Sequence, residues 1–348
     1  MIRVVVAEDS LTVRTLLVGV LQSDPEIQVI GEAKDGLEVV EMTVRLKPDL
    51  VTMDVHMPLQ DGFEATKEIM VLAPTPIVIV SSSASGRDVE LSLNAMRAGA
   101  LAVVRKPESP DSELFNGHRE RLLAMVKAMA QVKLVRRWRS LAPTPARPGR
   151  LAPQAGAIEL VAVATSTGGP AALHRVLADL DGSFPVPVLV VQHMAAGFIG
   201  GLATWLDSNC DLRVKVAEQQ EVLSPRTVYL APDERHLGVS RDGRIHLGSE
   251  PAIGGFRPSA TYLFQSAARA YGSRMLAVIM TGMGADGVDG LRSAKEAGAK
   301  VLGQDEASSV VYGMARAAMD AGVVDTQLPV TEIGWHLMNL IGGGKRCP

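Results

Sequence analysis

The sequence predicts an α/β protein made of two doubly wound domains, each built around a parallel sheet. Short β-branched runs alternate with segments of helical periodicity in the first half, and the same alternation restarts at Glu159. Between the halves lies a segment rich in Pro, Ala and Arg, which is typical of an extended linker. The chain has 348 residues, which fits two domains at about 150 residues each.

The first domain is predicted over residues 1–135 and contains five strand candidates, each followed by a helical pattern. The last helical pattern covers roughly residues 114–135. The strand candidates are 2–7, 27–31, 49–53, 76–80 and 102–104. Five strand–helix units in this length indicate a doubly wound sheet.

The linker is predicted over residues 136–157 and the second domain over residues 158–348. The strand candidates of the second domain are 159–164, 187–192, 213–216, 227–231, 274–280 and 299–303. A hairpin is also predicted around 236–247, with its turn at Arg241-Asp242-Gly243. We expect this domain to be Rossmann-like.

Bulk composition excludes several classes of protein. A hydrophobic fraction of 47% and a charged fraction of 21% fit a globular chain, and a net charge of −3 argues against binding to nucleic acid. Cys210 and Cys347 are far apart and lack the spacing of zinc ligands. No apolar run approaches the roughly 18 residues of a membrane span, and the start does not resemble a signal peptide. We therefore expect a cytoplasmic protein.

Acidic residues follow two strands of the first domain, at the points where these strands end. Glu8 and Asp9 come after the first strand, and Asp54 comes after the third. Because the carboxyl ends of parallel strands share one edge of a sheet, we expect the three carboxylates to lie together. Their repulsion favours a divalent cation, and such a site suits Mg²⁺. Each acid alone is better explained as a solvated loop residue, whereas the full set favours a binding site.

The same edge is predicted to hold a hydroxyl and an ammonium group, since Ser81 ends the fourth strand and Lys106 follows the fifth. Both groups suit an added phosphoryl group. The segment from Asp54 to Gly62 has the pattern D-x-x-M-P-x-x-D-G, and Pro107 follows Lys106. With these motifs, about the first 130 residues resemble a response-regulator receiver domain, which has a flavodoxin-like fold.

The resemblance implies that a histidine kinase phosphorylates Asp54. It also implies that Glu8, Asp9 and Asp54 hold Mg²⁺, and that Ser81 and Lys106 sense the phosphate. One position departs from the family pattern, because Val103 stands where Tyr or Phe is frequent. The role of Val103 at this position, where the family couples phosphorylation through rotation of an aromatic ring, is therefore left open by the sequence.

In the second domain, the first strand runs into Thr165-Ser166-Thr167-Gly168-Gly169-Pro170, and a helical pattern follows. Glycines permit a tight turn and proline suits a first helical turn, so Ser166 is expected at a helix N-terminus. Backbone N–H groups there can bind an oxyanion. Considered alone, Ser166 or Thr167 is better explained as a helix cap.

A histidine, His193, follows the second strand of this domain and can reach the same sheet edge. Considered alone, it is better explained as a structural residue. Three other histidines compete as the base. His174 and His246 fit less well, because one lies in the helix after Ser166 and the other in the hairpin, whereas His236 stays open.

Two interpretations compete for the glycine-rich loop after strand 274–280. Gly282-x-Gly284-x-x-Gly287 matches the dinucleotide fingerprint, and Asp305 falls at a suitable distance for a ribose. This pattern favours an NAD-dependent oxidoreductase. Asp286, however, lies inside the loop that would hold the pyrophosphate, where its charge would repel the ligand.

The alternative is a catalytic triad. A serine hydroxyl becomes nucleophilic when a base takes its proton, and a carboxylate orients that base. Ser166, His193 and Asp286 supply one group of each kind after three strands. Their order differs from that of α/β-hydrolases, and no G-x-S-x-G is present, which indicates a different hydrolase fold.

These motifs, together with Phe256 to Ser259 and Gln304 to Met314, resemble the catalytic domain of chemotaxis protein-glutamate methylesterases. The resemblance implies that Ser166, His193 and Asp286 form the triad, and that the N–H groups of Thr167 and Met283 form the oxyanion hole. Ala164-Thr165, Ala195 and Ala315 depart from the family pattern but spare the triad.

The implied activity is hydrolysis of glutamate methyl esters on the cytoplasmic helices of chemoreceptors, which releases methanol, with deamidation of receptor glutamines by the same route. Ester hydrolysis needs no cofactor. The implied partners are the receptor and a chemotaxis histidine kinase, with attachment to the membrane only through the receptor. A receiver-linked scaffold without catalysis and an NAD-dependent oxidoreductase remain as alternatives.

Overall fold

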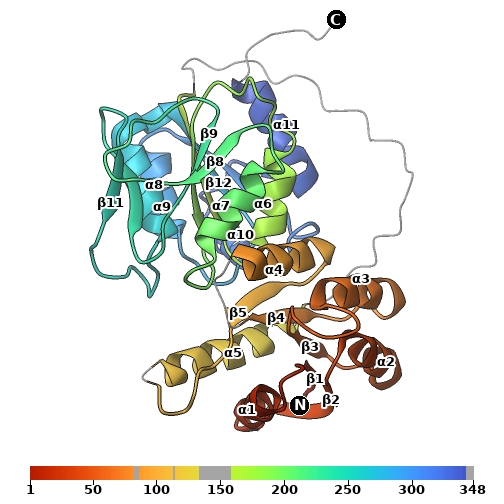
Figure 1. Cartoon of the computed structure of the whole chain (residues 1–348). Helices are drawn as coiled ribbons and strands as arrows, with labels where there is room; N and C mark the ends of the chain where they lie inside the picture. The colour runs from red at the N-terminus through yellow and green to blue at the C-terminus, as the bar shows by residue number, and fades with distance from the viewer. Residues whose placement is uncertain (82–85, 113, 133–157, 342–348) are drawn as a thin grey trace, which may run out of the picture. The chain divides into compact units, whose positions relative to one another are not determined.

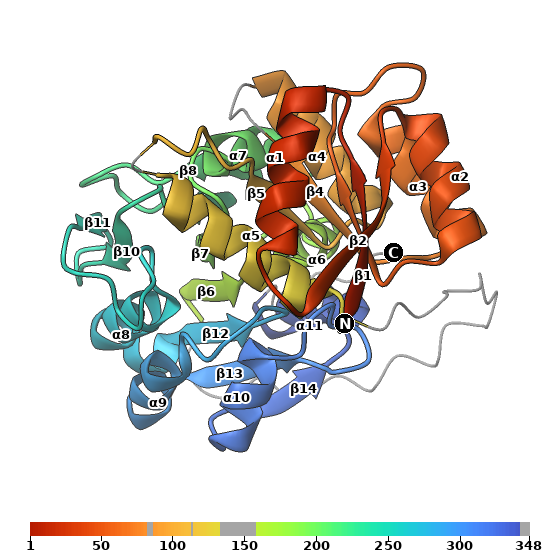
Figure 2. The ribbon, with the colours of Figure 1, turned by 90° about the horizontal axis from the view of Figure 1, so that it is seen from below.

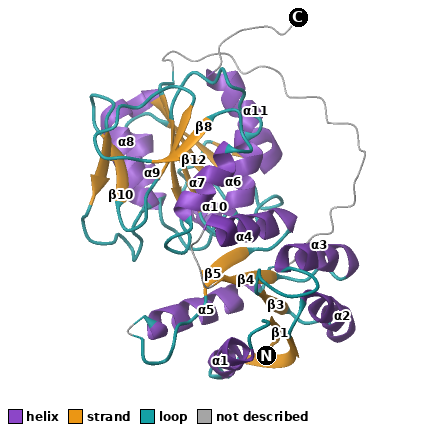
Figure 3. Cartoon of the chain, in the orientation of Figure 1, coloured by secondary structure: helices purple, strands orange, loops and turns teal. Residues whose placement is uncertain are grey.

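The computed structural model describes residues 1–81, 86–112, 114–132 and 158–341 (Figure 1). The chain divides into two compact units, Met1–Ala142 and Pro143–Pro348. The linker predicted over 136–157 lies outside the described residues. Figure 3 makes the alternation of strands and helices visible in both units.

The first unit is a five-stranded parallel sheet in the order β2-β1-β3-β4-β5, the strand order of flavodoxin-like folds. Its strands are β1 (Ile2–Ala7), β2 (Ile27–Ala33), β3 (Leu50–Met53), β4 (Ile77–Ser81) and β5 (Ala102–Arg105). Its helices are α1 (Leu11–Gln22), α2 (Gly36–Leu46), α3 (Gly62–Leu72), α4 (Gly86–Ala98) and α5 (Phe115–Met129). The predicted doubly wound parallel sheet is confirmed.

Helices cover both faces of this sheet. The helices α1 and α5 pack together, whereas α2, α3 and α4 form a continuous row on the other side (Figure 2). Three helices begin at side-chain caps: Ser10, Asp35 and Asp61 accept a hydrogen bond from the backbone N–H three residues later. These caps fix where each loop ends, and therefore which residues remain at the sheet edge.

The second unit contains a seven-stranded parallel sheet in the order β14-β13-β12-β6-β7-β9-β8. Its strands are β6 (Leu160–Thr165), β7 (Val188–Gln192), β8 (Arg213–Val216), β9 (Thr227–Leu230), β12 (Met275–Ile279), β13 (Lys300–Gln304) and β14 (Thr326–Leu328). The predicted hairpin is present as the antiparallel pair β10 (His236–Val239) and β11 (Ile245–Gly248). Strand β14 was not predicted.

Helices also alternate with the strands of the second unit. They are α6 (Gly169–Leu177), α7 (Ile199–Asp207), α8 (Ala260–Tyr271), α9 (Val288–Glu296), α10 (Met314–Asp320) and α11 (Val330–Ile341), with a short 3₁₀ helix at Gly272–Arg274. The chain runs from β6 to β7 on one side and later returns to β12 on the other. This reversal beside β6 is a topological switch point, the usual place for a site in an open α/β sheet.

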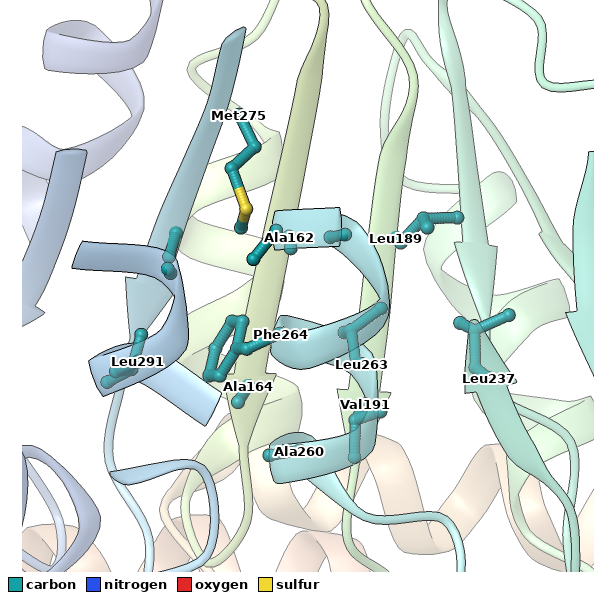
Figure 4. Packing of buried hydrophobic residues seen from close by; sticks show 14 of the residues in the cluster. Ala162, Ala164, Leu189, Val191, Leu237, Ala260, Leu263, Phe264, Met275 and Leu291 are labelled. Atoms are coloured by element: carbon teal, nitrogen blue, oxygen red, sulfur yellow. The ribbon is translucent and has the colours of Figure 1, made fainter. Parts of the chain in front are cut away.

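The core of the second unit lies between this sheet and α8. Phe264 and Leu263 of α8 are fully buried against β6, where the small side chains of Ala162 and Ala164 leave room for them (Figure 4). This packing fixes the axis of α8 and brings its N-terminus to the carboxyl edge of the sheet. No described helix combines the length and apolar composition of a membrane span.

Candidate active site

The segments that follow three neighbouring strands are hydrogen-bonded side by side. The N–H of Ser166, after β6, donates to the carbonyl of Thr281 at 3.0 Å. The N–H of His193, after β7, donates to the carbonyl of Thr165 at 2.9 Å. The register of β6 and β7 pairs Thr165 with Gln192, so both strands end at the same level. The predicted serine and histidine therefore lie at one sheet edge.

The third predicted residue, Asp286, contacts the histidine directly. Its Oδ2 lies 3.0 Å from Nε2 of His193, and both side chains are at least 90% buried. This is the distance of an ion pair, although the ring N–H direction does not meet the angle of a hydrogen bond. Catalytic hydrogen bonds are often poorly aligned without substrate and tighten when it binds.

The N-terminus of α8 holds the same carboxylate. Asp286 accepts hydrogen bonds from the hydroxyl of Ser259 at 2.8 Å, the N–H of Ala260 at 2.7 Å and the N–H of Thr261 at 3.1 Å. Ser259 also caps α8 by accepting from the N–H of Tyr262. The helix therefore provides both donors and the positive end of its dipole to the carboxylate.

These contacts decide the charge of Asp286. Burial raises the pKa of its carboxyl group, but His193, the N–H of Ala260 and the hydroxyl of Ser259 outweigh burial and lower the pKa to about 2. The group is thus a carboxylate at neutral pH. It can stabilise a positive charge that develops on His193.

The imidazole ring of His193 is held from one face. Phe256 stacks on it with ring centroids 4.4 Å apart and an interplanar angle of 13°. Because Nε2 faces Asp286, Nδ1 is the other nitrogen able to accept a proton, and it is buried without a hydrogen-bond partner among the described residues. Sequence patterns did not single out Phe256 or Ser259 for these contacts.

The competing histidines are placed elsewhere. His236 is fully buried, and its Nδ1 accepts from the N–H of Ser259 at 3.2 Å while Nε2 lies 3.2 Å from the carbonyl of Pro251. Both of its ring nitrogens are therefore engaged in structural contacts. His174 lies within α6 and His246 within β11, as predicted from their sequence positions.

The two predicted oxyanion donors have free N–H groups. Neither the N–H of Thr167 nor that of Met283 donates a hydrogen bond within the described parts of the chain. Gly282, next to Met283, packs on Ser166 so closely that an added Cβ would lie 2.6 Å from the Cβ of Ser166. Only glycine fits at this position, so the loop after β12 must pass directly beside the serine.

A second loop, between β13 and α10, supports this arrangement. Gln304 is fully buried and accepts from the N–H of Thr281 at 2.8 Å. The hydroxyl of Thr281 donates to the carbonyl of Thr167 at 2.9 Å and accepts from the N–H of Val311 at 3.0 Å. The loops after β6, β12 and β13 therefore form one hydrogen-bonded layer.

The dinucleotide interpretation does not fit this geometry. The carboxylate of Asp305 accepts from the N–H and hydroxyl of Ser308, which ties it into its own turn. The glycine loop is closed against Ser166 by Gly282, and Asp286 places a negative charge within it. A pyrophosphate would meet both obstacles.

In the first unit, the three predicted carboxylates also lie together. Glu8, Asp9 and Asp54 offer ligand oxygens that all lie within 4.8 Å of one another. Lys106 contacts two of them, with Nζ at 2.7 Å from Glu8 and 2.8 Å from Asp54. Its backbone N–H donates to the carbonyl of Ser81, which places Ser81 beside it. The donor set is all oxygen, which fits a hard cation such as Mg²⁺.

Burial dominates the electrostatics of this cluster. It raises the pKa of both Asp54 and Glu8, although the Lys106 ammonium partly opposes the increase. The two carboxylates in turn outweigh the effect of burial on Lys106 and raise its pKa. Val103, at the position that is often aromatic, is 8% exposed in the sheet.

In comparisons with known proteins, the two halves of the chain match two different family models. Residues 161–337 match the family model described as CheB methylesterase, and residues 4–115 match the response regulator receiver domain. A Myxococcus xanthus protein named protein-glutamate methylesterase/protein-glutamine glutaminase 4 is 51% identical, covering 98% of each chain. An Anaeromyxobacter dehalogenans protein, numbered 3 under the same name, is 49% identical over 97% of this chain and 98% of its own.

One solved structure resembles the second unit. The crystal structure of the Thermotoga maritima CheB methylesterase catalytic domain is 38% identical and superposes with a TM-score of 0.51. The match covers 54% of this chain and 100% of the other.

Proposed function

The chain belongs to the family of receiver-linked CheB methylesterases, and from this membership we propose that it hydrolyses glutamate methyl esters on chemoreceptors. The products are methanol and the receptor glutamate. We further propose that it deamidates receptor glutamines and acts in the cytoplasm, on the cytoplasmic helices of the receptor. The arrangement of Ser166, His193 and Asp286 at the switch point of the sheet is the observation that supports this chemistry most directly.

Acylation begins with attack of the Ser166 hydroxyl on the ester carbonyl carbon. As the bond forms, His193 accepts the hydroxyl proton, and Nδ1 is the nitrogen assigned to this task because Nε2 faces Asp286. The carboxylate of Asp286 stabilises the imidazolium. The imidazolium then gives its proton to the departing methoxide, which leaves as methanol.

The negative charge of the tetrahedral intermediate develops on the former carbonyl oxygen. The N–H groups of Thr167 and Met283, free of other hydrogen bonds, are proposed to receive it. Donors fixed in advance of the reaction stabilise such a charge efficiently.

Deacylation repeats the sequence with water. His193 takes a proton from the attacking water molecule, the bond to Ser166 breaks, and the serine recovers a proton from the imidazolium. Glutamine would follow the same path, with ammonia as the leaving group in place of methanol.

Control is proposed to come from the receiver. A histidine kinase would transfer a phosphoryl group to Asp54, with Ser81 and Lys106 contacting the added phosphate. Glu8, Asp9 and Asp54 would hold Mg²⁺, and the ion would supply positive charge to balance the negative charge of the phosphoryl group. Because Lys106 contacts both Glu8 and Asp54, a change of charge at Asp54 alters the contacts at the end of β5.

The direct test measures methanol release from membranes that carry a receptor methylated with a labelled methyl group. We expect release by the purified chain, with an increase on adding a small phosphodonor and Mg²⁺. A receptor that keeps its label under both conditions, while a known methylesterase removes it, would contradict the proposed activity.

A further inference from the structure

Gln192 connects the backbone of the proposed nucleophile to that of the proposed base. It is the last residue of β7 and is 2% exposed. Its side-chain NH₂ donates one hydrogen bond to the carbonyl of Ser166 and another to the carbonyl of His193, both at 2.8 Å. A single amide group therefore bridges the two segments.

The chemistry of the contact requires an amide. Both partners are carbonyl oxygens, so the side chain must present two N–H donors from one atom, and a carboxylate would present none. The other atom of the amide, Oε1, is buried without a hydrogen-bond partner among the described residues. An unpaired buried acceptor destabilises a fold, so packing alone does not explain a glutamine here.

The surroundings leave a slot of the right size for this amide. A Cβ added at Gly169 would lie 2.1 Å from Oε1 of Gln192 and 2.5 Å from Oγ1 of Thr165. The close approach of α6 to the amide therefore depends on the glycine. Gly169 thus makes room for the bridge, whereas Gly168 adopts the positive φ of the turn before α6.

The bridge fixes the direction of an oxyanion donor. The carbonyl of Ser166 and the N–H of Thr167 belong to one peptide unit, which is planar and trans, so the two groups point in opposite directions. The N–H of Gly169 also donates to the Ser166 carbonyl, at 2.9 Å. With its carbonyl held by Gln192 and Gly169, this peptide cannot rotate, and the N–H of Thr167 stays aimed.

The same bridge fixes the base. The N–H of His193 donates to the carbonyl of Thr165, and its own carbonyl accepts from Gln192. The backbone on both sides of the His193 side chain is therefore tied to the Ser166 segment. The position of the His193 ring relative to Ser166 depends on both of these hydrogen bonds.

We propose that Gln192 is a positioning residue for the hydrolase reaction, holding the Thr167 N–H and the His193 ring in register with Ser166. This proposal rests on the proposed function, because it assigns a role within that triad. Gln192 is buried behind the site, so it should affect kcat and leave KM within about twofold.

The test compares Gln192→Met and Gln192→Glu with the charge-matched control Gln219→Glu on the exposed surface of the same unit. The probe is a fluorophosphonate, whose phosphorus bonds to Oγ of an activated serine while the serine proton and fluoride leave. It requires no receptor. We expect labelling of Ser166 per folded molecule to slow by roughly 10- to 100-fold in both Gln192 variants, as for a disturbed oxyanion donor. The control should label at the wild-type rate.

The separate effects on kcat and KM distinguish a positioning role of Gln192 from a role in stability alone. Loss of kcat at constant KM in the methanol assay, in protein that stays folded, supports positioning. If the Gln192 variants label at the wild-type rate per folded molecule and differ only by a lower unfolding temperature, the positioning role is overturned. Failure of the unmodified protein to label at all would instead overturn the triad itself.

Should both variants fail to fold, hydrogen exchange in the unmodified protein tests the bridge on which the proposal depends. Both side-chain N–H protons of Gln192 should exchange far more slowly than those of the exposed Gln219, as seen by NMR. Equal exchange rates would show that the bridge does not exist in solution.

Discussion

Nε2 of His193 lies 3.0 Å from Oδ2 of Asp286, and the other contacts of this carboxylate all come from the start of α8. The proposed base, His193, is therefore oriented by the N-terminus of α8 acting through Asp286. Phe264 anchors α8 in the core of the second unit. The position of the His193 imidazole therefore depends on the packing of that core. A substitution at Asp286 should affect both catalysis and stability.

Asp286→Asn should lower kcat by a factor on the order of 10⁴ with little change in KM, because an amide does not stabilise the imidazolium. The side-chain NH₂ of the new asparagine would also face either the N–H donors of α8 or the His193 ring, and against the N–H donors it cannot accept a hydrogen bond. Asp289→Asn, on the exposed surface of α9, is the matched control and should keep full activity. Steady-state methanol release measures both, and equal rates would remove Asp286 from the triad.

The low pKa of Asp286 predicts a particular response to acid. The folded-state pKa of about 2 lies below the ordinary value of 3.8, so the unfolded chain binds a proton first as the pH falls. The contribution of this carboxylate to the free energy of unfolding is therefore complete above about pH 5, at about 2 kcal/mol, and about half of it is lost by about pH 3. Urea unfolding should show that the stability gap between wild type and Asp286→Asn narrows between pH 6 and pH 3. A difference in unfolding free energy that does not change with pH would contradict the low pKa assigned to Asp286.

Gly282→Ala tests the contact between the loop after β12 and the proposed nucleophile, Ser166. The new methyl group would lie 2.6 Å from the Cβ of Ser166 and 2.5 Å from the sulfur of Met314, so one of them must move. A displacement of about 1 Å at a nucleophile can reduce kcat roughly 100-fold. Gly200→Ala in α7 meets no atom within 4 Å and should retain activity while stabilising the fold by about 0.5–1 kcal/mol. Full activity in Gly282→Ala would mean that the loop does not constrain Ser166.

Asp54→Asn should abolish stimulation by acetyl phosphate and Mg²⁺ while leaving basal ester hydrolysis unchanged. The reason is that an amide does not accept the phosphoryl group, whereas the proposed catalytic residues lie in the other unit. Asp111→Asn, an exposed residue of the receiver, should respond like wild type, and chelation of Mg²⁺ should remove the response of both wild type and control. Continued stimulation of Asp54→Asn would place control at another residue.

Much of this fold could be predicted because the buried strands are β-branched runs that end in polar residues. That pattern located the ends of β1, β3, β6, β7 and β12 and, with them, the candidate site residues. Strand β14 was missed because Thr326–Leu328 is three residues long and carries no such run. Strands this short are defined by pairing with a neighbour, which the sequence does not display.

The contacts that hold the site could not be predicted. Ser259 and Asp286 are separated by 27 positions, and no local periodicity relates a helix cap to a distant carboxylate. His236 stayed open as a base until its burial and its two structural contacts were known. The sequence did not single out Gln192, because the two carbonyl groups that it bridges, those of Ser166 and His193, belong to different segments.

Nucleophilic catalysis by Ser166 is tested most directly by Ser166→Ala, assayed for methanol release from labelled receptor membranes with phosphodonor present. Removal of the hydroxyl should reduce release to the background of membranes alone, while thermal unfolding and Mg²⁺ binding by the receiver stay as in wild type. Release at the wild-type rate by folded Ser166→Ala protein would contradict the triad.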